Sequence, residues 1–345
     1  MDTLVEIRSL TVELPTAAGW VKPVNEVSLR IESGGSVGLV GESGSGKTML
    51  ALALMGLLPP GARVGGEILL LSRENGKEKT GRTKAEAQRT LRSAERVLVG
   101  LTAEEWRGVR GREIAMIFQE PMTSLNPVMR IGAQIEEAIL AHEPDLPGEQ
   151  LRERLLAAMK QAALSEPEVR AGQYPHHLSG GLRQRAMIAM ALAPQPKLLI
   201  ADEPTTALDV TVQKQILDLL DRLRRELGLA LLFITHDLGV VARVADRVAV
   251  MYAGRIVEEG PMQQVLTGPK HPYTQGLLAA SPTLEKRALT PIPGTVPQLM
   301  ELPPGCAFAP RCALRRAECD VKVPEFRHVD AGQAARCVLI EEGVR

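Results

Sequence analysis

Aromatic side chains make up only 3% of the 345 residues, and neither charge sign is in excess, since 41 Lys and Arg balance 41 Asp and Glu. The shortage of aromatics leaves few platforms on which single-stranded nucleic acid could stack. A net charge of zero argues against general binding to nucleic acid or to an anionic membrane. The remaining composition, 45% apolar and 24% charged, is ordinary for a globular protein, and we expect no nucleic-acid partner.

Long hydrophobic runs are also missing. The longest uninterrupted apolar segment, residues 49–58, is well short of the roughly 18 residues that cross a bilayer as a helix. The first residues carry an acid early and lack the basic segment and apolar stretch of a secretory signal. We therefore expect neither a transmembrane helix nor a signal peptide, and a protein that stays in the cytosol.

Cysteine is absent until residue 306, after which the spacing is C-x5-C-x6-C-x17-C: Cys306, Cys312, Cys319 and Cys337. In a reducing compartment such clustering indicates a metal or cluster site more than disulfides. Four thiolates can hold a [4Fe–4S] cluster or a tetrahedral Zn²⁺, and the spacing lacks the close C-x2-C pairs that are common in zinc ribbons. Free or disulfide-linked thiols are the third interpretation.

Short apolar segments alternate with helical stretches along the chain, at residues 36–40, 114–118, 198–201, 229–234 and 248–252. This alternation predicts an α/β fold with a buried parallel sheet. Residues 4–14 and 27–31 alternate apolar and polar positions instead, which predicts strands with one solvated face.

Composition also predicts how the chain is divided. Residues 73–96 are polar and charged, which predicts an inserted surface segment, and helical periodicity predicts a helical subdomain over about residues 128–185. From about residue 268 the proline density rises, which disfavours regular structure. We therefore expect one large unit over residues 1–262 and a small C-terminal region over residues 263–345.

A glycine-rich segment lies between an apolar strand and a predicted helix. It reads Gly41-Glu42-Ser43-Gly44-Ser45-Gly46-Lys47-Thr48 and fits the phosphate-binding pattern G-x-x-x-x-G-K-[ST]. The glycines let backbone N–H groups converge on phosphate oxygens, and the helix N-terminus adds the positive end of its dipole. We expect Lys47 to contact the β- and γ-phosphates of a nucleotide and the Thr48 hydroxyl to ligate Mg²⁺.

Other apolar segments end in polar residues that suit the same chemistry. Asp202, at the end of one segment, suits Mg²⁺ coordination, and the adjacent Glu203 can polarise a water for attack on the γ-phosphate. Gln119 and His236 each follow another predicted strand. Ligands bind at the carboxyl edge of a parallel sheet, so Gln119 is placed to reach the Mg²⁺ or the attacking water, and His236 to reach the nucleotide.

In this order, the motifs resemble those of the ATP-binding subunits of ABC transporters. Leu178-Ser179-Gly180-Gly181 before a predicted helix resembles the signature of that family, although Leu182 replaces the usual fifth residue, Gln. The resemblance covers about residues 1–262 and implies a P-loop NTPase core with an antiparallel β subdomain and a helical signature subdomain.

The resemblance also implies roles for single residues. It makes Glu203 the general base, His236 a γ-phosphate contact and Asp209, in the D-loop 207–209, an interface residue. It implies a second ATPase subunit, because the phosphate loop of one subunit faces the signature of the other. In this family an aromatic residue stacks on adenine. Trp20 is the available candidate, and packing of Trp20 at the surface is the alternative.

Two further segments resemble the ATPases of dipeptide and oligopeptide importers, a group that includes nickel and glutathione importers. They are residues 117–127 and His271-Pro272-Tyr273-Thr274. The resemblance implies a motor that couples Mg-ATP hydrolysis to peptide uptake at the cytoplasmic face of the inner membrane.

The expected partners are a paralogous ATPase subunit, two permeases and, indirectly, an extracytoplasmic solute-binding protein. The resemblance also favours a [4Fe–4S] cluster for the four cysteines. Nickel or glutathione uptake, or a soluble ABC ATPase acting on nucleic acid or ribosomes, are the alternatives.

Overall fold

The computed structural model describes residues 2–72, 94–119, 124–206, 208–281, 290–330 and 332–340. The insertion expected at 73–96 lies outside the described residues except at its end, which forms strand β5 (Ala94–Val97). Residues 120–123 of the importer-like segment and Ala207 of the D-loop also lie outside them.

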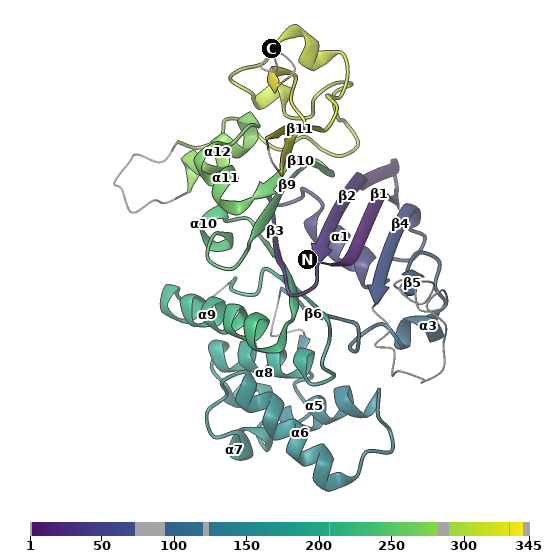
Figure 1. Ribbon diagram of the computed structural model, residues 1–345, viewed down its shortest axis with the longest axis vertical. Coiled ribbons are helices and arrows are strands. Elements are labelled where there is room, and N and C mark those ends of the chain that lie inside the picture. Colours follow the sequence, from purple (N-terminus) through teal and green to yellow (C-terminus); the bar gives the residue numbers. More distant parts are fainter. Residues whose placement is uncertain are drawn as a thin grey trace, which may run out of the picture.

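Two sheets organise the chain (Figure 1). The four-stranded sheet is antiparallel, in the order β2-β1-β4-β5, and contains β1 (Thr3–Thr16), β2 (Gly19–Glu32) and β4 (Arg63–Ser72). The eight-stranded sheet has the order β11-β12-β10-β9-β3-β8-β7-β6. Its strands are β3 (Ser36–Val40), β6 (Ile114–Ile117), β7 (Leu198–Asp202), β8 (Ala230–Thr235), β9 (Arg247–Tyr252), β10 (Arg255–Pro261), β11 (Arg327–Asp330) and β12 (Gln333–Ala335).

The centre of the larger sheet is parallel, as the apolar segments predict. β3 pairs in parallel with β8 and β9, and β7 pairs in parallel with β6 and β8. Every residue of β3, β6, β7 and β8 is buried. The carboxyl ends of these strands therefore lie along one edge of the sheet.

Helices and 3-10 turns complete the described structure. The helices are α1 (Lys47–Leu54), α3 (Ala103–Arg107), α5 (Ile131–Leu140), α6 (Gly148–Gln161), α7 (Pro167–Ala171), α8 (Gly180–Leu192), α9 (Val210–Leu227), α10 (Leu238–Val241), α11 (Met262–Thr267) and α12 (Pro272–Ala280). The 3-10 turns are η1 (Pro175–His177), η2 (Ala309–Arg311), η3 (Ala317–Asp320) and η4 (Val338–Ile340). Helices α5 to α8 fall within or overlap the predicted helical segment.

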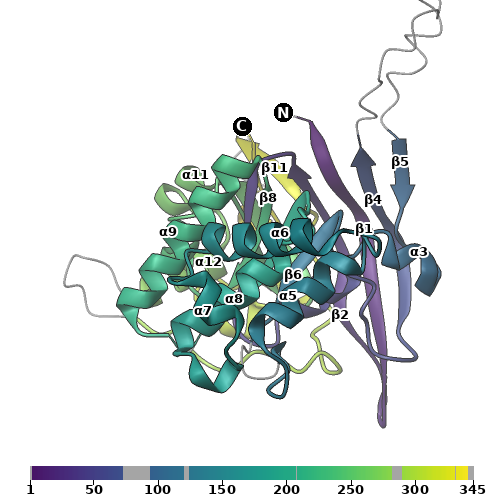
Figure 2. The ribbon, with the colours of Figure 1, turned by 90° about the horizontal axis from the view of Figure 1, so that it is seen from below.

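Two hydrophobic cores cover the two faces of the larger sheet. Leu199 and Ala201 of β7 belong to a core shared with α5, α6, α8 and α9. Leu198 and Ile200, which point to the other face, belong to a core shared with α1 and the four-stranded sheet. Side chains alternate between the faces of a strand, so one apolar run supplies both cores. Figure 2 shows the helices α5 to α9 and the four-stranded sheet on opposite sides of the molecule.

The C-terminal region continues the larger sheet. β12 pairs with β10, and β11 pairs with β12, all antiparallel. The boundary expected at residue 262 falls at the start of α11, so hydrogen bonds between strands cross it. The division into two units stays a prediction. Within the described ranges, no helix is long and apolar enough to cross a membrane.

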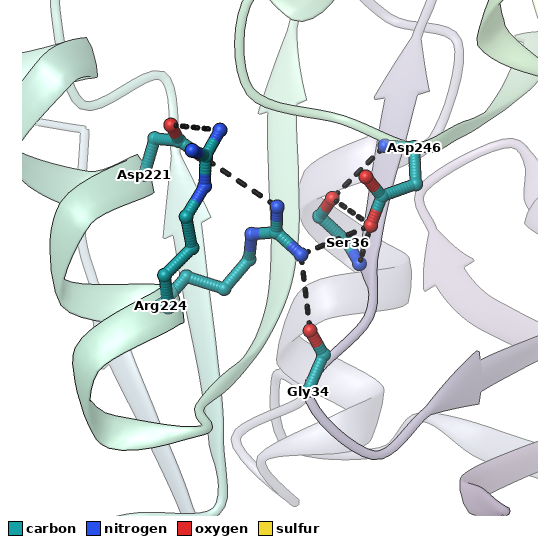
Figure 3. Close-up of polar contacts among 6 residues, drawn as sticks. Gly34, Ser36, Asp221, Arg224 and Asp246 are labelled. Carbon is teal, nitrogen blue, oxygen red and sulfur yellow. Dashed lines mark hydrogen bonds and ion pairs between the residues drawn. The ribbon is translucent and has the colours of Figure 1, made fainter. Parts of the chain in front are cut away.

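A polar network fixes the strand starts at the edge opposite the carboxyl ends (Figure 3). Asp246, just before β9, accepts hydrogen bonds from the backbone N–H and hydroxyl of Ser36 at 3.1 and 2.8 Å. Arg224, near the end of α9, donates to the same carboxylate and to the Gly34 carbonyl oxygen, both at 3.0 Å. The network therefore ties α9 to the starts of β3 and β9.

We expect Arg224→Met to lower the free energy of unfolding by about 1–3 kcal/mol, because it removes the donor to the Gly34 carbonyl oxygen and to the Asp246 carboxylate in a partly buried network. Arg225→Met is the matched control. Arg225 bonds Asp221 from a side chain that is 69% exposed, so its loss should cost no more than about 0.5 kcal/mol. Urea unfolding measures both variants, and equal losses would contradict this account of the network.

Candidate functional site

The glycine-rich segment forms a loop between β3 and α1 that leaves no room for a side chain at its first and last glycines. Gly46 has φ 105°, and a Cβ atom there would lie 1.9 Å from the Pro23 carbonyl oxygen. A Cβ atom on Gly41 would lie 2.2 Å from the Met251 carbonyl oxygen. Glycine is required at both positions because neighbouring backbone approaches so closely.

Lys47 opens α1 and is buried beneath this loop. Its ammonium group donates to the carbonyl oxygens of Gly41 and Glu42 at 2.7 and 2.9 Å. Burial lowers the pKa of Lys47, and the carboxylates of Glu203, Asp202 and Glu42 oppose that shift. The Lys47 ammonium group therefore lies beside the loop, and phosphate oxygens can replace the two carbonyl oxygens that it now contacts.

Asp202, the last residue of β7, has a buried carboxylate. Its Oδ1 atom has no hydrogen-bond partner within the described residues. Burial raises its pKa, and a hydrogen bond with Thr48 opposes the shift. A hydroxyl beside a desolvated carboxylate is a suitable donor set for Mg²⁺, and the cation would offset the cost of charge on Asp202.

Glu203 receives polar side chains from three directions. The Gln119 amide donates to its Oε2 atom at 3.4 Å, and the Thr206 hydroxyl donates to the same atom at 2.9 Å. His236 Nδ1 lies 3.5 Å from Oε1. Glu203 also has a left-handed backbone, φ 45°, which costs energy in a non-glycine residue and is typical of functional sites.

The structure thus brings together Gln119, Glu203 and His236, which the sequence predicts as catalytic. Thr206 was missed by sequence reasoning. The sequence feature that could have indicated Thr206 is the pair of hydroxyl residues, Thr205 and Thr206, two and three positions after Glu203.

The signature residues lie apart from the phosphate loop in the folded molecule. Ser179 caps α8, where its Oγ accepts the Leu182 N–H at 3.4 Å, and a Cβ atom on Gly181 would lie 2.8 Å from the side chain of Val212. Asp209 caps α9 by accepting the Val212 N–H at 2.9 Å. Figure 1 shows α8 grouped with α5 to α7, whereas α1 lies with the strands. The signature therefore packs against the first turn of α9, the helix that Asp209 of the D-loop caps.

Trp20 lies in β2, next to the turn between β1 and β2, and is 43% exposed. The Arg63 guanidinium stacks over its ring, 3.8 Å from the centroid. This contact covers one face of the indole. The role of Trp20 as an adenine platform stays a prediction.

The four cysteines line one cavity. Cys306, Cys312, Cys319 and Cys337 are all free thiols there, with Phe308 among the other lining residues. Burial and the neighbouring thiols raise the pKa values of Cys306 and Cys312, and raise that of Cys337 to about 11. Across the described ranges, no group of three or more His, Cys, Asp or Glu residues is placed so that it could hold a metal ion.

Comparison with known proteins is informative over nearly the whole chain. The family described as ABC transporter matches residues 24–206, and the oligopeptide/dipeptide transporter C-terminal region matches residues 257–319. The oligopeptide transport ATP-binding protein OppD of Bacillus subtilis is 48% identical over 89% of this chain and 81% of its own. A Brucella melitensis protein named as a peptide import ATP-binding protein is 46% identical over 98% of both chains.

Solved structures share the fold. A dimeric bacterial ABC transporter cassette, and a dimeric ATP-binding cassette in a post-hydrolysis state with ADP and Pi, each have a TM-score of 0.61 and 27% identity. Each comparison covers 75% of this chain and 98% of the other. The resemblance inferred from the motifs is confirmed, while the nature of the cysteine site stays a prediction. The chain belongs to the ABC transporter family, as one of its ATP-hydrolysing subunits.

Proposed function

We propose that this chain is the ATP-hydrolysing motor of an ABC importer for peptides. The observation that carries the proposal is the Glu203 carboxylate, held by Gln119, Thr206 and His236 beside the phosphate loop. The matched C-terminal region and the names of the two relatives support peptides as the solute. They also favour an importer over a soluble ABC ATPase that acts on nucleic acid or ribosomes. Nickel and glutathione are the alternative solutes.

The residues at the sheet edge have separate roles in metal binding, phosphate binding and proton transfer. Thr48 and Asp202 would hold Mg²⁺, which when bound neutralises charge on the phosphates. Lys47 exchanges its backbone acceptors for β- and γ-phosphate oxygens, and residues 41–46 offer backbone N–H groups. Glu203 takes the proton of the attacking water, while Gln119 and His236 orient that water and the γ-phosphate.

A second subunit completes the ATP site in this proposal. Ser179 and Gly180 stand at the N-terminal end of α8, where backbone N–H groups favour an anion. A dimer would bring this end of α8 to the nucleotide on the other subunit, with Asp209 at the interface. We infer that the partner is a paralogous ATPase, and that the pair acts on two permeases at the cytoplasmic face of the membrane. A solute-binding protein supplies peptide from outside.

Glu203→Gln should bind ATP within about threefold of the wild-type affinity and lose hydrolysis by a factor of about 10²–10⁴, because the amide cannot accept the proton. Steady-state ATPase assays and binding of a fluorescent ATP analogue measure the two quantities. Glu226→Gln, at an exposed position on α9, is the control and should leave both unchanged. Turnover retained in Glu203→Gln would contradict the assignment of the base.

We also propose that the cysteine cavity holds a [4Fe–4S] cluster, with Zn²⁺ as the alternative. Four free thiols that line one cavity supply the donor set of either group. Their raised pKa values fit a site in which a bound cation, rather than the apo protein, stabilises the thiolates. When bound, the group cross-links the turns of a segment that has little regular structure.

Protein purified without oxygen should contain iron and acid-labile sulfide, and Cys337→Ser should lose both and melt at a lower temperature, since one ligand is missing. Elemental analysis and a sulfide assay measure the content. Zinc without sulfide would establish the alternative group. Wild-type protein with neither metal, or Cys337→Ser with full iron content, would contradict the site.

A further inference from the structure

A buried ion pair joins the phosphate loop to the cysteine region. Arg311 immediately precedes Cys312, yet its guanidinium reaches Glu42, the second residue of the phosphate loop. Nη1 and Nη2 donate to the two carboxylate oxygens at 2.7 and 3.0 Å. Only 4% of the Arg311 side chain is exposed, against 30% for Glu42. A two-bond contact of this kind fixes orientation as well as charge.

The backbone of Glu42 is also held from the C-terminal region, by a residue that precedes the cysteines. Its N–H donates to the hydroxyl of Tyr273, in α12, at 2.8 Å. Tyr273 is fully buried, with its ring centroid 4.6 Å from that of Tyr252 and 5.3 Å from that of Phe308. The C-terminal region therefore clamps the loop residue at both main chain and side chain.

The residues that form this clamp are themselves fixed. The Arg311 Nε donates to the Pro293 carbonyl oxygen at 2.8 Å. The Tyr273 N–H donates to His271 Nδ1 at 3.0 Å, and the His271 N–H donates to the buried Glu258 carboxylate at 2.9 Å. These bonds hold the Arg311 guanidinium and the backbone of Tyr273 in place.

The negative charge of Glu42 makes its contact with Arg311 matter for nucleotide binding. Glu42 lies in the loop that receives a highly anionic triphosphate, and an unpaired carboxylate there would repel it. Arg311 neutralises that carboxylate from a buried side chain, and electrostatic interactions near a protein's surface or interior are stronger than in bulk solvent. Loss of Arg311 would free the loop and leave a negative charge beside the phosphates.

We propose that Arg311 is a positioning residue for the phosphate loop, through which the four-cysteine region sets the affinity of the site for nucleotide. The inference rests on the proposed ATPase function and deepens it, because it makes the C-terminal region a regulator of ATP binding.

The first test is Arg311→Met in the full-length chain. The Kd for a fluorescent ATP analogue and the KM for ATP should rise about five- to tenfold, the size of coupling seen within one hydrogen-bond network, with kcat within twofold of wild type. A merely structural role would lower the active fraction, and so the apparent kcat, without moving KM. Arg311→Lys, which keeps the charge but not the two-bond geometry, should show a smaller rise and guards against misfolding of the first variant.

Arg315→Met is the matched control. Arg315 also forms a two-bond pair with a carboxylate, that of Asp320, and lies three residues after Cys312, but it is about half exposed. This variant should leave Kd and KM at wild-type values. Adding Glu42→Gln to Arg311→Met should recover most of the lost affinity, because it removes the unpaired charge.

Cys312→Ser tests whether the cysteine region acts through Arg311. It should weaken ATP binding in the wild-type background and add nothing to Arg311→Met. Wild-type affinity in Arg311→Met, equal effects in Arg315→Met, no recovery by Glu42→Gln, or additive loss with Cys312→Ser would each overturn the inference. A wild-type chain that neither binds nor hydrolyses ATP would instead overturn the proposed ATPase function and, with it, this inference.

Discussion

The site depends on the parallel pairing of β3, β8, β7 and β6. In this register Val40 pairs with Thr235, and Asp202 pairs with Ile234, so the strands end at one level. Asp202 lies at the end of its strand, and the phosphate loop, Glu203, Gln119 and His236 follow the ends of theirs. A shift of one residue in any strand would exchange its two faces and misplace the polar residue after it. The two hydrophobic cores, which take alternate residues of the same strands, prevent that shift.

Contiguous motifs were predictable from sequence because local geometry determines their function. The phosphate loop needs glycine where the backbone is left-handed or crowded, and the apolar strands before each polar residue predict where the sheet edge lies. The contact between Arg311 and Glu42 was not predictable in this way, since it joins residues 269 positions apart. Nor does a propensity argument foresee that β11 and β12 extend the main sheet, because their pairing depends on tertiary context.

The rise in proline density predicts a small C-terminal region set apart from the large unit. If that region were independent, a change at Cys312 would leave nucleotide binding largely intact. The observed contacts support the opposite expectation. Tyr273 and Arg311 both hold Glu42, so the region reaches the nucleotide loop through main chain and side chain together. With the proposed role of Arg311, such a connection would let the state of the cysteine cavity affect ATP binding.

The most direct test of the account is uptake of labelled dipeptide, longer peptide, glutathione and nickel by cells that lack redundant importers. Cells that carry the wild-type gene are compared with cells that carry Glu203→Gln. The account predicts that peptide uptake is lost in the variant while uptake of nickel and glutathione is unchanged. Peptide uptake at the wild-type rate in the variant, or a selective loss of nickel or glutathione uptake, would contradict it.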